Sequence, residues 1–451
     1  MNKMKFLSAA LAAVIAVSGM SLMPENSVFE TATAETATYS EESTYEKLTY
    51  EVVDDEYVRI TGCDGSVTYI DIPDEIDGYP VREIGEHAFS STHYLSEVKF
   101  GIEVKKIGDY AFSHSNIKEI VIPEGIEEIG IYAFWSSDLT EIDLPDSLRE
   151  IGSSAFNDTP LTNNQYEAGE KVCYADNWLV ECGNTAEVET KSGTKGLANS
   201  ALLGSNAQYV KIGNGVEIIG DYAFGGLTSI ETIEIADSVT TIGDEAFYYT
   251  NCEVTLPAKL TELGTRAFAS SKIKKIVIPD KLTVIKNDTF YDCNNLEEVI
   301  FGSGLNTIDS NAFTSCDRIT EITFPENVSE INWRAFEYCS SLEKVVIENP
   351  ECVIAPSEDT FGSAARIYGY TGSTAQEYAK KYNRDFIPLD VLLGDANSDG
   401  DVNVRDCAAI AKALAKNKTD TLPASADFNG DGEVTVRDAA AIARWLAKGG
   451  K

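Results

Sequence analysis

The sequence predicts an α/β solenoid built on a parallel β-sheet, followed by a small all-α domain. An Ala-Phe pair recurs through most of the chain, mostly at intervals of 21 to 23 residues. An Ile or Leu precedes each Phe by five residues, and a short strand of alternating apolar and polar residues follows it. Near the C-terminus one acidic loop occurs twice, 32 residues apart. A fixed period of about 20 to 29 residues with one strand per unit is typical of a stacked solenoid.

The repeat should bury its apolar side chains by stacking like residue on like. Each unit is too small to bury its Ile, Leu and Phe alone, so about a dozen coils together form a parallel sheet and an internal spine of Phe rings. One long gap holds a degenerate repeat centred on Leu202 and an insertion around 174–180. The marker residues are Phe89, Phe112, Phe134, Phe156, Phe224, Phe247, Phe268, Phe290, Phe313 and Phe336.

Composition limits the classes of partner. The 451 residues carry 73 acidic and 36 basic side chains, which gives a formal net charge of −37. Phosphate binding needs clustered Lys and Arg, so nucleic acids and anionic membranes are disfavoured as partners. The acidic excess favours solubility outside the cell and the binding of cations.

The N-terminus reads as a secretory signal. Lys3 and Lys5 precede an apolar run over 6–17, and Ala32-Thr33-Ala34 offers a small-residue cleavage site. The prediction is a signal peptide over 1–34, a polar segment over 35–47 and a secreted, extracellular mature protein. No later segment is long and apolar enough to span a membrane.

The repeat motifs resemble a known family. An Ile-Gly-x-x-Ala-Phe core, an Ile-x-Ile-Pro strand and the closing sequence over 369–375 resemble the bacterial surface-antigen leucine-rich repeats of the BspA-like class. The resemblance implies a leucine-rich-repeat solenoid with terminal caps over 48–390. It also implies that the domain is a surface for adhesion or protein binding rather than for catalysis.

The cysteines suggest packing more than cross-linking. Cys293, Cys316 and Cys339 recur every 23 residues, which is the structural period, so they are interpreted as buried thiols. Cys173 and Cys182 either pair across a hairpin or remain thiols. No zinc-binding spacing of Cys and His is present.

Few residues are suited to catalysis. The three histidines all lie in the first two repeats, and a regular solenoid offers no pocket for a nucleophilic triad. Carboxylates are abundant, so a pair suited to glycoside hydrolysis matters only if it lies in a cleft. The chain is predicted not to be an enzyme.

The outward strand positions are either a solvated face or a ligand surface. Solenoids commonly bind through such a face, and β-branched residues here suit a protein or peptide better than a sugar. A sugar-stacking role for Trp135, Tyr248, Tyr249 and Tyr291 is the weaker alternative. The candidate face comprises Glu119, Val121, Glu141, Val277, Glu298, Ile300, Glu321, Thr323 and Val346.

The duplicated loops predict calcium binding. In each loop Asp stands at positions 1, 5 and 12, Asn at position 3 and Gly at position 6. Such oxygen ligands suit Ca²⁺, a hard cation with flexible coordination geometry. An alanine-rich helix with an apolar stripe follows each loop. Because so small a domain buries little apolar surface, we expect the ions to supply part of its folding free energy.

The doubled loop and helix, with Asp rather than Glu at position 12, resemble a type I dockerin over 391–451. The resemblance implies two structural Ca²⁺ ions, with Asp401 and Glu433 giving main-chain oxygens. The implied ligands are Asp395, Asn397, Asp399, Asp401, Asp406, Asp427, Asn429, Asp431, Glu433 and Asp438.

The same resemblance implies a partner, a cohesin module on the scaffold of a cellulosome. The Ser-Thr pair common at loop positions 10 and 11 is absent, so the particular cohesin is open. Both halves present a similar basic and valine-containing face, which favours an acidic partner surface and two binding orientations. The implied contact residues are Val404, Arg405, Lys412, Lys416, Val436, Arg437, Arg444 and Lys448.

The sequence therefore predicts a secreted, non-catalytic binding protein, a solenoid tethered by a Ca²⁺-dependent dockerin to a cohesin on a cellulosome scaffold or cell surface. One alternative is an enzyme or accessory protein of plant polysaccharide degradation. Another is a cell-surface adhesin or inhibitor that acts on other proteins. The ligand of the solenoid is an unknown protein or glycan.

Overall fold

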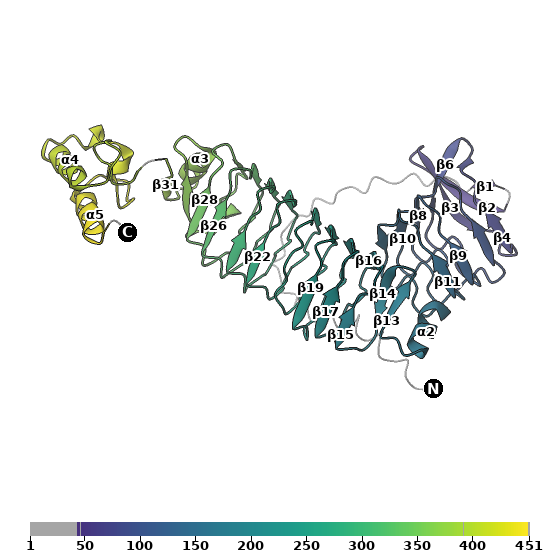
Figure 1. The fold of residues 1–451 in the computed structure, drawn as a ribbon. Helices are drawn as coiled ribbons and strands as arrows, with labels where there is room; N and C mark the ends of the chain where they lie inside the picture. Colours follow the sequence, from purple (N-terminus) through teal and green to yellow (C-terminus); the bar gives the residue numbers. More distant parts are fainter. Residues whose placement is uncertain (1–42, 46, 391, 450–451) are drawn as a thin grey trace, which may run out of the picture. The chain divides into compact units, whose positions relative to one another are not determined.

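The computed structural model describes residues 43–45, 47–390 and 392–449 (Figure 1). The chain divides into two compact units. The first runs to Thr185 and also includes Ala198–Asn206, and the second comprises Ala186–Leu197 and Ala207–Lys451. The predicted signal peptide lies outside the described residues, as does most of the polar segment that follows it. Within the described ranges, no helix combines the length and apolar character that a membrane crossing requires.

The first unit begins with an antiparallel meander and continues as parallel coils. β1, β2 and β3 pair antiparallel, and β3 then pairs parallel with β6. Its elements are β1 (Ser43–Tyr45), β2 (Leu48–Val53), β3 (Tyr57–Cys63), β4 (Tyr69–Asp71), β5 (Glu75–Ile76), β6 (Tyr79–Ile84), β7 (Glu97–Lys99), β8 (Lys106–Ile107), β9 (Glu119–Val121), β10 (Glu128–Ile129), β11 (Glu141–Asp143), β12 (Glu150–Ile151), α2 (Pro160–Glu167), β13 (Val172–Ala175) and β14 (Trp178–Cys182).

The second unit contains further parallel coils and the C-terminal helices. Its strands are β15 (Glu187–Glu189), β16 (Gly196–Leu197), β17 (Tyr209–Ile212), β18 (Ile218–Ile219), β19 (Thr232–Ile235), β20 (Thr241–Ile242), β21 (Glu262–Leu263), β22 (Lys275–Val277), β23 (Val284–Ile285), β24 (Glu298–Ile300), β25 (Thr307–Ile308), β26 (Glu321–Phe324), β27 (Glu330–Ile331), β28 (Lys344–Ile347), β29 (Val353–Ile354), β30 (Arg366–Gly369) and β31 (Phe386–Pro388). Its helices are η1 (Glu358–Thr360), α3 (Thr374–Lys381), α4 (Val404–Ala415), η2 (Thr419–Thr421), η3 (Ala424–Ala426) and α5 (Val436–Ala447).

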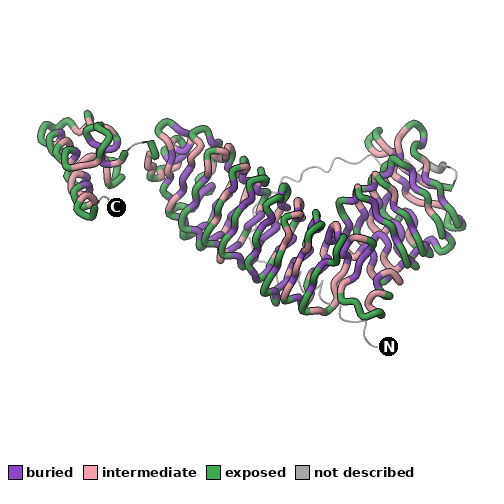
Figure 2. Tube along the Cα trace, in the orientation of Figure 1, coloured by how far each residue is buried: buried purple, intermediate pink, exposed green. Residues whose placement is uncertain are grey.

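The solenoid is confirmed, and the described residues wind through about 14 turns, slightly more than the dozen predicted. A typical turn has a long strand of three or four residues, a short strand of two residues, and a turn that carries the Ala-Phe pair, called here the Phe turn. Figure 2 shows buried segments repeating from turn to turn in each unit. The Phe rings stack at centroid distances of 5.2 to 5.5 Å from Phe89 to Phe156, and of 4.8 to 5.4 Å from Phe224 to Phe336.

The row of short strands was not predicted, although the sequence carries a signal for it. These strands end at the Ile or Leu five residues before each Phe, and most pair in parallel with the next, as Ile107 does with Ile129. A Gly often follows, and a Cβ at Gly130 would lie 2.5 Å from Asp109 Oδ1. The missing side chain lets the main chains of successive turns approach each other.

The irregular gap is filled as the sequence suggested, with one addition. Leu202 is buried at the place of a Phe, as a degenerate repeat requires. The insertion forms α2 and the antiparallel hairpin of β13 and β14. Thr159 caps α2 and Pro160 begins it, which is the pattern expected at a helix start.

The last turns close with a helix. α3 begins at Thr374 and buries Ala375, Tyr378 and Ala379. Thr374 Oγ1 donates to the carbonyl of Cys352 at 2.6 Å, and the ring of Tyr378 packs edge-on against Phe361. The helix therefore covers apolar side chains that a further coil would otherwise bury.

The two C-terminal helices form a small domain around a short apolar core. Ala396, Ile410, Ala426 and Ile442 are buried together. Val402, Leu414, Val434 and Leu446 pack against them. α4 and α5 each begin with a capping box, so both helix starts are fixed by their own loops.

Candidate calcium loops and binding surfaces

The first acidic loop is organised by two carboxylates at its ends. Asp395, at position 1, accepts hydrogen bonds from the main-chain N–H groups of Asp399 at 3.0 Å and Gly400 at 2.8 Å. Asp406, at position 12, accepts from Asn397 N at 3.1 Å and from Asn403 N at 2.8 Å. The position-12 carboxylate therefore closes the loop and completes the capping box of α4 in the same contact.

The second loop uses carboxylates at the same two positions, although Asp427 binds the N–H of position 4 where Asp395 binds that of position 5. Asp427 accepts from Gly430 N at 2.9 Å and Gly432 N at 2.8 Å, and Asp438 accepts from Asn429 N at 3.1 Å and Thr435 N at 2.8 Å. Partial burial raises the pKa of Asp427 above its usual range, and the negative charge of Asp438 adds to this increase. The hydrogen bond from Gly432 N acts in the opposite direction.

The loops fit a hard cation in their donor chemistry. Asp406 and Asp438 are fully buried, yet within the described ranges neither forms an ion pair with Lys, Arg or His. A buried charge without a counter-charge is costly, and a bound cation would supply one. Among the described residues, no group of three or more His, Cys, Asp or Glu side chains lies close enough together to hold a metal ion by itself. The loops add Asn side chains and main-chain oxygens to their carboxylates.

Two residues that sequence reasoning missed tie the first loop to the second. Ser425 is buried, its hydroxyl donates to the carbonyl of Asp395 at 2.5 Å, and its carbonyl accepts from Gly394 N at 2.7 Å. Gly394 has φ of +97°, and a Cβ there would lie 2.7 Å from Val402 Cγ1. The Gly just before the loop was the available signal for this close packing.

The residues implied for partner recognition are all exposed. Val404 and Val436, the first residues of α4 and α5, are 74% and 68% exposed, although both are apolar. The basic members Arg405, Lys412, Lys416, Arg437, Arg444 and Lys448 are exposed as well. Each helix thus presents valine and positive charge on its own exposed surface, which suits an acidic partner.

The outward strand face differs between the units. In the first unit Glu119 and Glu141 lie opposite each other on β9 and β11, and neither forms an ion pair in the described part of the chain. In the second unit Lys275 lies 2.9 Å from Glu298, which leaves a neutral pair.

The apolar members of that face lie beside these charges. Val277 and Ile300 are register partners and are 48% and 42% exposed, while Val121 in the first unit is exposed too. Val346 was wrongly placed on the exposed face, since it is only 8% exposed. Its register partner on β30 is Tyr368, whose large side chain shares that face.

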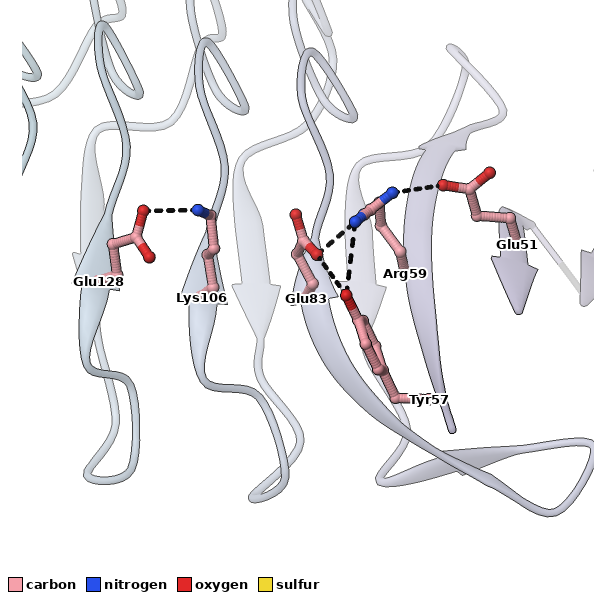
Figure 3. A network of polar contacts seen from close by, with 6 residues as sticks. All are labelled: Glu51, Tyr57, Arg59, Glu83, Lys106 and Glu128. Atoms are coloured by element: carbon pink, nitrogen blue, oxygen red, sulfur yellow. Dashed lines mark hydrogen bonds and ion pairs between the residues drawn. The ribbon is translucent and has the colours of Figure 1, made fainter. Parts of the chain in front are cut away.

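One polar hollow of about 420 Å³ lies in the first unit, lined by residues that include Glu51, Arg59, Glu83 and Lys106 (Figure 3). Arg59 is 2.7 Å from Glu51 and 2.8 Å from Glu83, and Lys106 is 2.6 Å from Glu128. Burial opposes the charge of Arg59, but the hydrogen bonds that its guanidinium donates to Glu83 and Glu51 raise its pKa. The guanidinium lies between the two carboxylates, where a glycosidic oxygen would have to lie. The charged side chains of the hollow therefore form ion pairs across neighbouring strands, which is not the arrangement of two free carboxylates that glycoside hydrolysis requires.

The periodic cysteines are buried thiols, as predicted. Cys293, Cys316 and Cys339 donate to the carbonyls of Phe268, Phe290 and Phe313 at 3.0 to 3.2 Å. Burial raises the pKa of Cys293 and of Cys339 to about 12. The hairpin around Cys173 and Cys182 is present, but both residues are free thiols.

The aromatic side chains at the Phe turns mostly contact one another. His87, Tyr110 and Tyr132 stack at 4.8 and 5.1 Å. His114 and Tyr132 meet Trp135 edge-on, and in the second unit the guanidinium of Arg266 lies 5.9 Å from the rings of Tyr248 and Tyr291. Sugar stacking needs free ring faces, so this arrangement favours a structural role for the rings.

Comparison with solved structures returns bacterial leucine-rich-repeat proteins. A protein from Bacteroides ovatus is 20% identical, covers 77% of this chain and 99% of its own, and has a TM-score of 0.38. A protein from Eubacterium ventriosum is 18% identical with coverage of 72% and 94% and a TM-score of 0.34. The pneumococcal vaccine antigen PcpA is 18% identical with coverage of 78% and 99% and a TM-score of 0.28. Likenesses this weak carry no inference about function. No curated protein matches the chain.

Family profiles match both parts of the chain. The profile of the BspA type leucine rich repeat region matches residues 61–176, 175–271 and 252–355, and that of the dockerin type I domain matches 393–447. The stacked Phe turns and the paired loop–helix units are the structural counterparts of these matches. The chain therefore belongs to the BspA-type leucine-rich-repeat family and carries a type I dockerin domain.

Proposed function

We propose that this protein is an exported, non-catalytic binding protein whose solenoid is held on a cohesin-bearing scaffold by its dockerin. The observation that carries the proposal is the repeated exposed face of α4 and α5. An exposed Val and Arg begin both helices, 32 residues apart. Exposed apolar and arginine side chains at equivalent places suit a protein partner that binds either helix.

The proposal assigns two structural Ca²⁺ ions to the loops, one held by the donors of 395–406 and the other by those of 427–438. Support comes from Asp406 and Asp438, which are buried and form no ion pair with another described residue. The ions would neutralise these charges and fix the start of each helix. The proposal also includes a signal peptide over 1–34, a solenoid over 48–390 and a dockerin over 391–451.

The solenoid's role in this proposal is to hold a second ligand on its strand face. The surface around Val277 and Ile300 combines exposed β-branched side chains with the neutral Lys275–Glu298 pair. That composition imposes little charge repulsion on an incoming protein or peptide. A fragment spanning 48–390 should retain such a ligand when it is immobilised, whereas glycans should wash through.

The attachment is tested with the full chain and a panel of immobilised cohesins. We expect at least one cohesin to bind in calcium and to release the protein when a chelator is added. Binding that persists in chelator, or no binding to any cohesin of the panel, would argue against the proposal. Turnover of plant polymers by the purified chain, lost on replacement of one carboxylate pair, would favour the enzyme instead.

A further inference from the structure

The two calcium loops differ in one chemical respect. Position 3 is Asn in both, but position 4 is Ser398 in the first loop and Gly430 in the second. The pair Asn429-Gly430 is one of two Asn-Gly pairs in the chain, the other being Asn214-Gly215 in the solenoid. Asn followed by Gly is the pair most prone to lose its side-chain amide, because Gly places no side chain in the path of the reaction.

We propose that Asn429 is a site of spontaneous deamidation and that calcium bound to the second loop suppresses the reaction. The main-chain nitrogen of Gly430 attacks Cγ of Asn429, which forms a five-membered succinimide and releases Nδ2 as ammonia. Water then opens the ring at either carbonyl and gives Asp or isoaspartate at 429. No oxidant, enzyme or further reactant is needed.

The folded loop engages both reacting groups in hydrogen bonds. Gly430 N donates to Asp427 Oδ1 at 2.9 Å, and Asn429 Oδ1 accepts from Asp431 N at 2.9 Å. Asn429 N is itself bound to Asp438 Oδ1 at 3.1 Å. Attack requires these bonds to open, so whatever stabilises the closed loop slows the reaction in proportion.

The first loop is a built-in control. Ser398 has φ of +61° and Gly430 has φ of +72°, so both residues occupy the same backbone region. Both are exposed, and a Cβ at Gly430 would meet no atom within 4 Å. Two differences remain at the reacting bond. One is the side chain of position 4, and the other is the hydrogen bond to the position-1 carboxylate, which Gly430 N donates in the second loop and Asp399 N donates in the first. The Ser398 side chain slows the attack in the first loop.

The two products differ in their effect on the second loop. Asp at position 3 keeps an oxygen ligand in place. Isoaspartate lengthens the main chain by one carbon between positions 3 and 4, so the bonds of Gly430 N and Gly432 N to Asp427 cannot both be kept. Ageing without calcium should thus disable the second loop and the face of α5, while it spares the first.

The test incubates the full chain at neutral pH in calcium or in chelator and follows three peptides by mass spectrometry. Calcium binding to fresh protein is measured in parallel by calorimetry, because the inference rests on the proposed calcium site. We expect Asn214 to react equally in both conditions and Asn397 to react slowly in both. Asn429 should react readily in chelator, and its rate in calcium should be lower by a factor of about ten or more. G430S should bring Asn429 to the rate of Asn397.

Two results would overturn the inference while leaving calcium binding intact: equal rates at Asn429 in calcium and chelator, or an inert Asn429 in chelator while Asn214 reacts. A calorimetric titration without binding would instead overturn the proposed calcium function, and calcium protection with it. If G430S fails to fold, the three wild-type sites still decide the outcome, since all are measured in one sample.

Discussion

The solenoid and the dockerin are both built from repeats, yet they stabilise those repeats in opposite ways. In the solenoid, Phe stacks on Phe at about 5 Å and the main chains of neighbouring turns bond directly, as Phe112 N does to the carbonyl of Ala133. In the dockerin, each repeat buries a carboxylate, Asp406 or Asp438, without a positive side chain beside it in the described residues.

The difference teaches which part of the protein depends on a ligand. A solenoid coil completes its packing with the next coil, so its stability lies within the chain. Under the proposed function, a cation completes the electrostatics of each dockerin loop, and folding and calcium binding would then be coupled there. The comparison can be broken by experiments that act on one region and leave the other unchanged.

The largest expected effect is that of calcium removal. Chelation should unfold α4 and α5, because the buried carboxylates lose the counter-charge that the proposal assigns to them. Hydrogen exchange by mass spectrometry should show full loss of protection over 404–447 and none over 79–347. Loss of protection in both regions would remove the distinction between them, and protection retained in both would remove the role of calcium.

The next effect is the removal of one ring from the Phe spine. Phe290→Ala should lower the free energy of unfolding of the solenoid by about 3–5 kcal/mol, since it leaves a cavity between two stacked rings. Tyr291→Ala, at the adjacent and exposed position, is the matched control and should cost about 0.5 kcal/mol. Thermal unfolding checks both. Cohesin binding should be unchanged in either variant, and a parallel loss would couple the two regions.

Charge reversal separates the two helix faces. Arg405→Glu alone should weaken cohesin binding by about twofold, because one of two equivalent orientations is lost. Arg405→Glu with Arg437→Glu should weaken it by about thirtyfold, or ~2 kcal/mol. Calorimetry at fixed salt measures both, with Lys274→Glu on the solenoid as control. A double variant with unchanged affinity would reject this surface.

The smallest effect is a pH dependence of the stability of the solenoid. Because burial raises the pKa of Cys339 from 9.0 to about 12, its contribution to stability is complete below pH 9 and falls as the pH rises towards 12. The loss from pH 9 to pH 10 should be about 1 kcal/mol for this thiol. Cys339→Ser should remove that part of the dependence, since Ser271 already fills the equivalent position without ionising. Identical pH profiles for both proteins would contradict the assignment.

The sequence predicted the structure best where a repeat interval or a residue spacing is compatible with one structure only. The interval between Ala-Phe pairs identified the coils and the Phe spine, and loop positions 1 and 12 marked the two carboxylates that organise each loop. The short strands were missed because two residues are too few to show an alternation. The exposure of Val346 was misjudged because alternation within one strand gives no information about the neighbouring coil, where its register partner is Tyr368.

By itself, the sequence determined that this protein is a repeat solenoid joined to a doubled acidic loop–helix unit, because periodic apolar burial and ligand spacing are local properties of a chain. Only the tertiary structure decided which charges are compensated. It brought Arg59 between Glu51 and Glu83 and left Asp406 and Asp438 buried without a cation from the described chain. The physical reason is that electrostatic partners come from different turns, and their distances depend on how the turns stack.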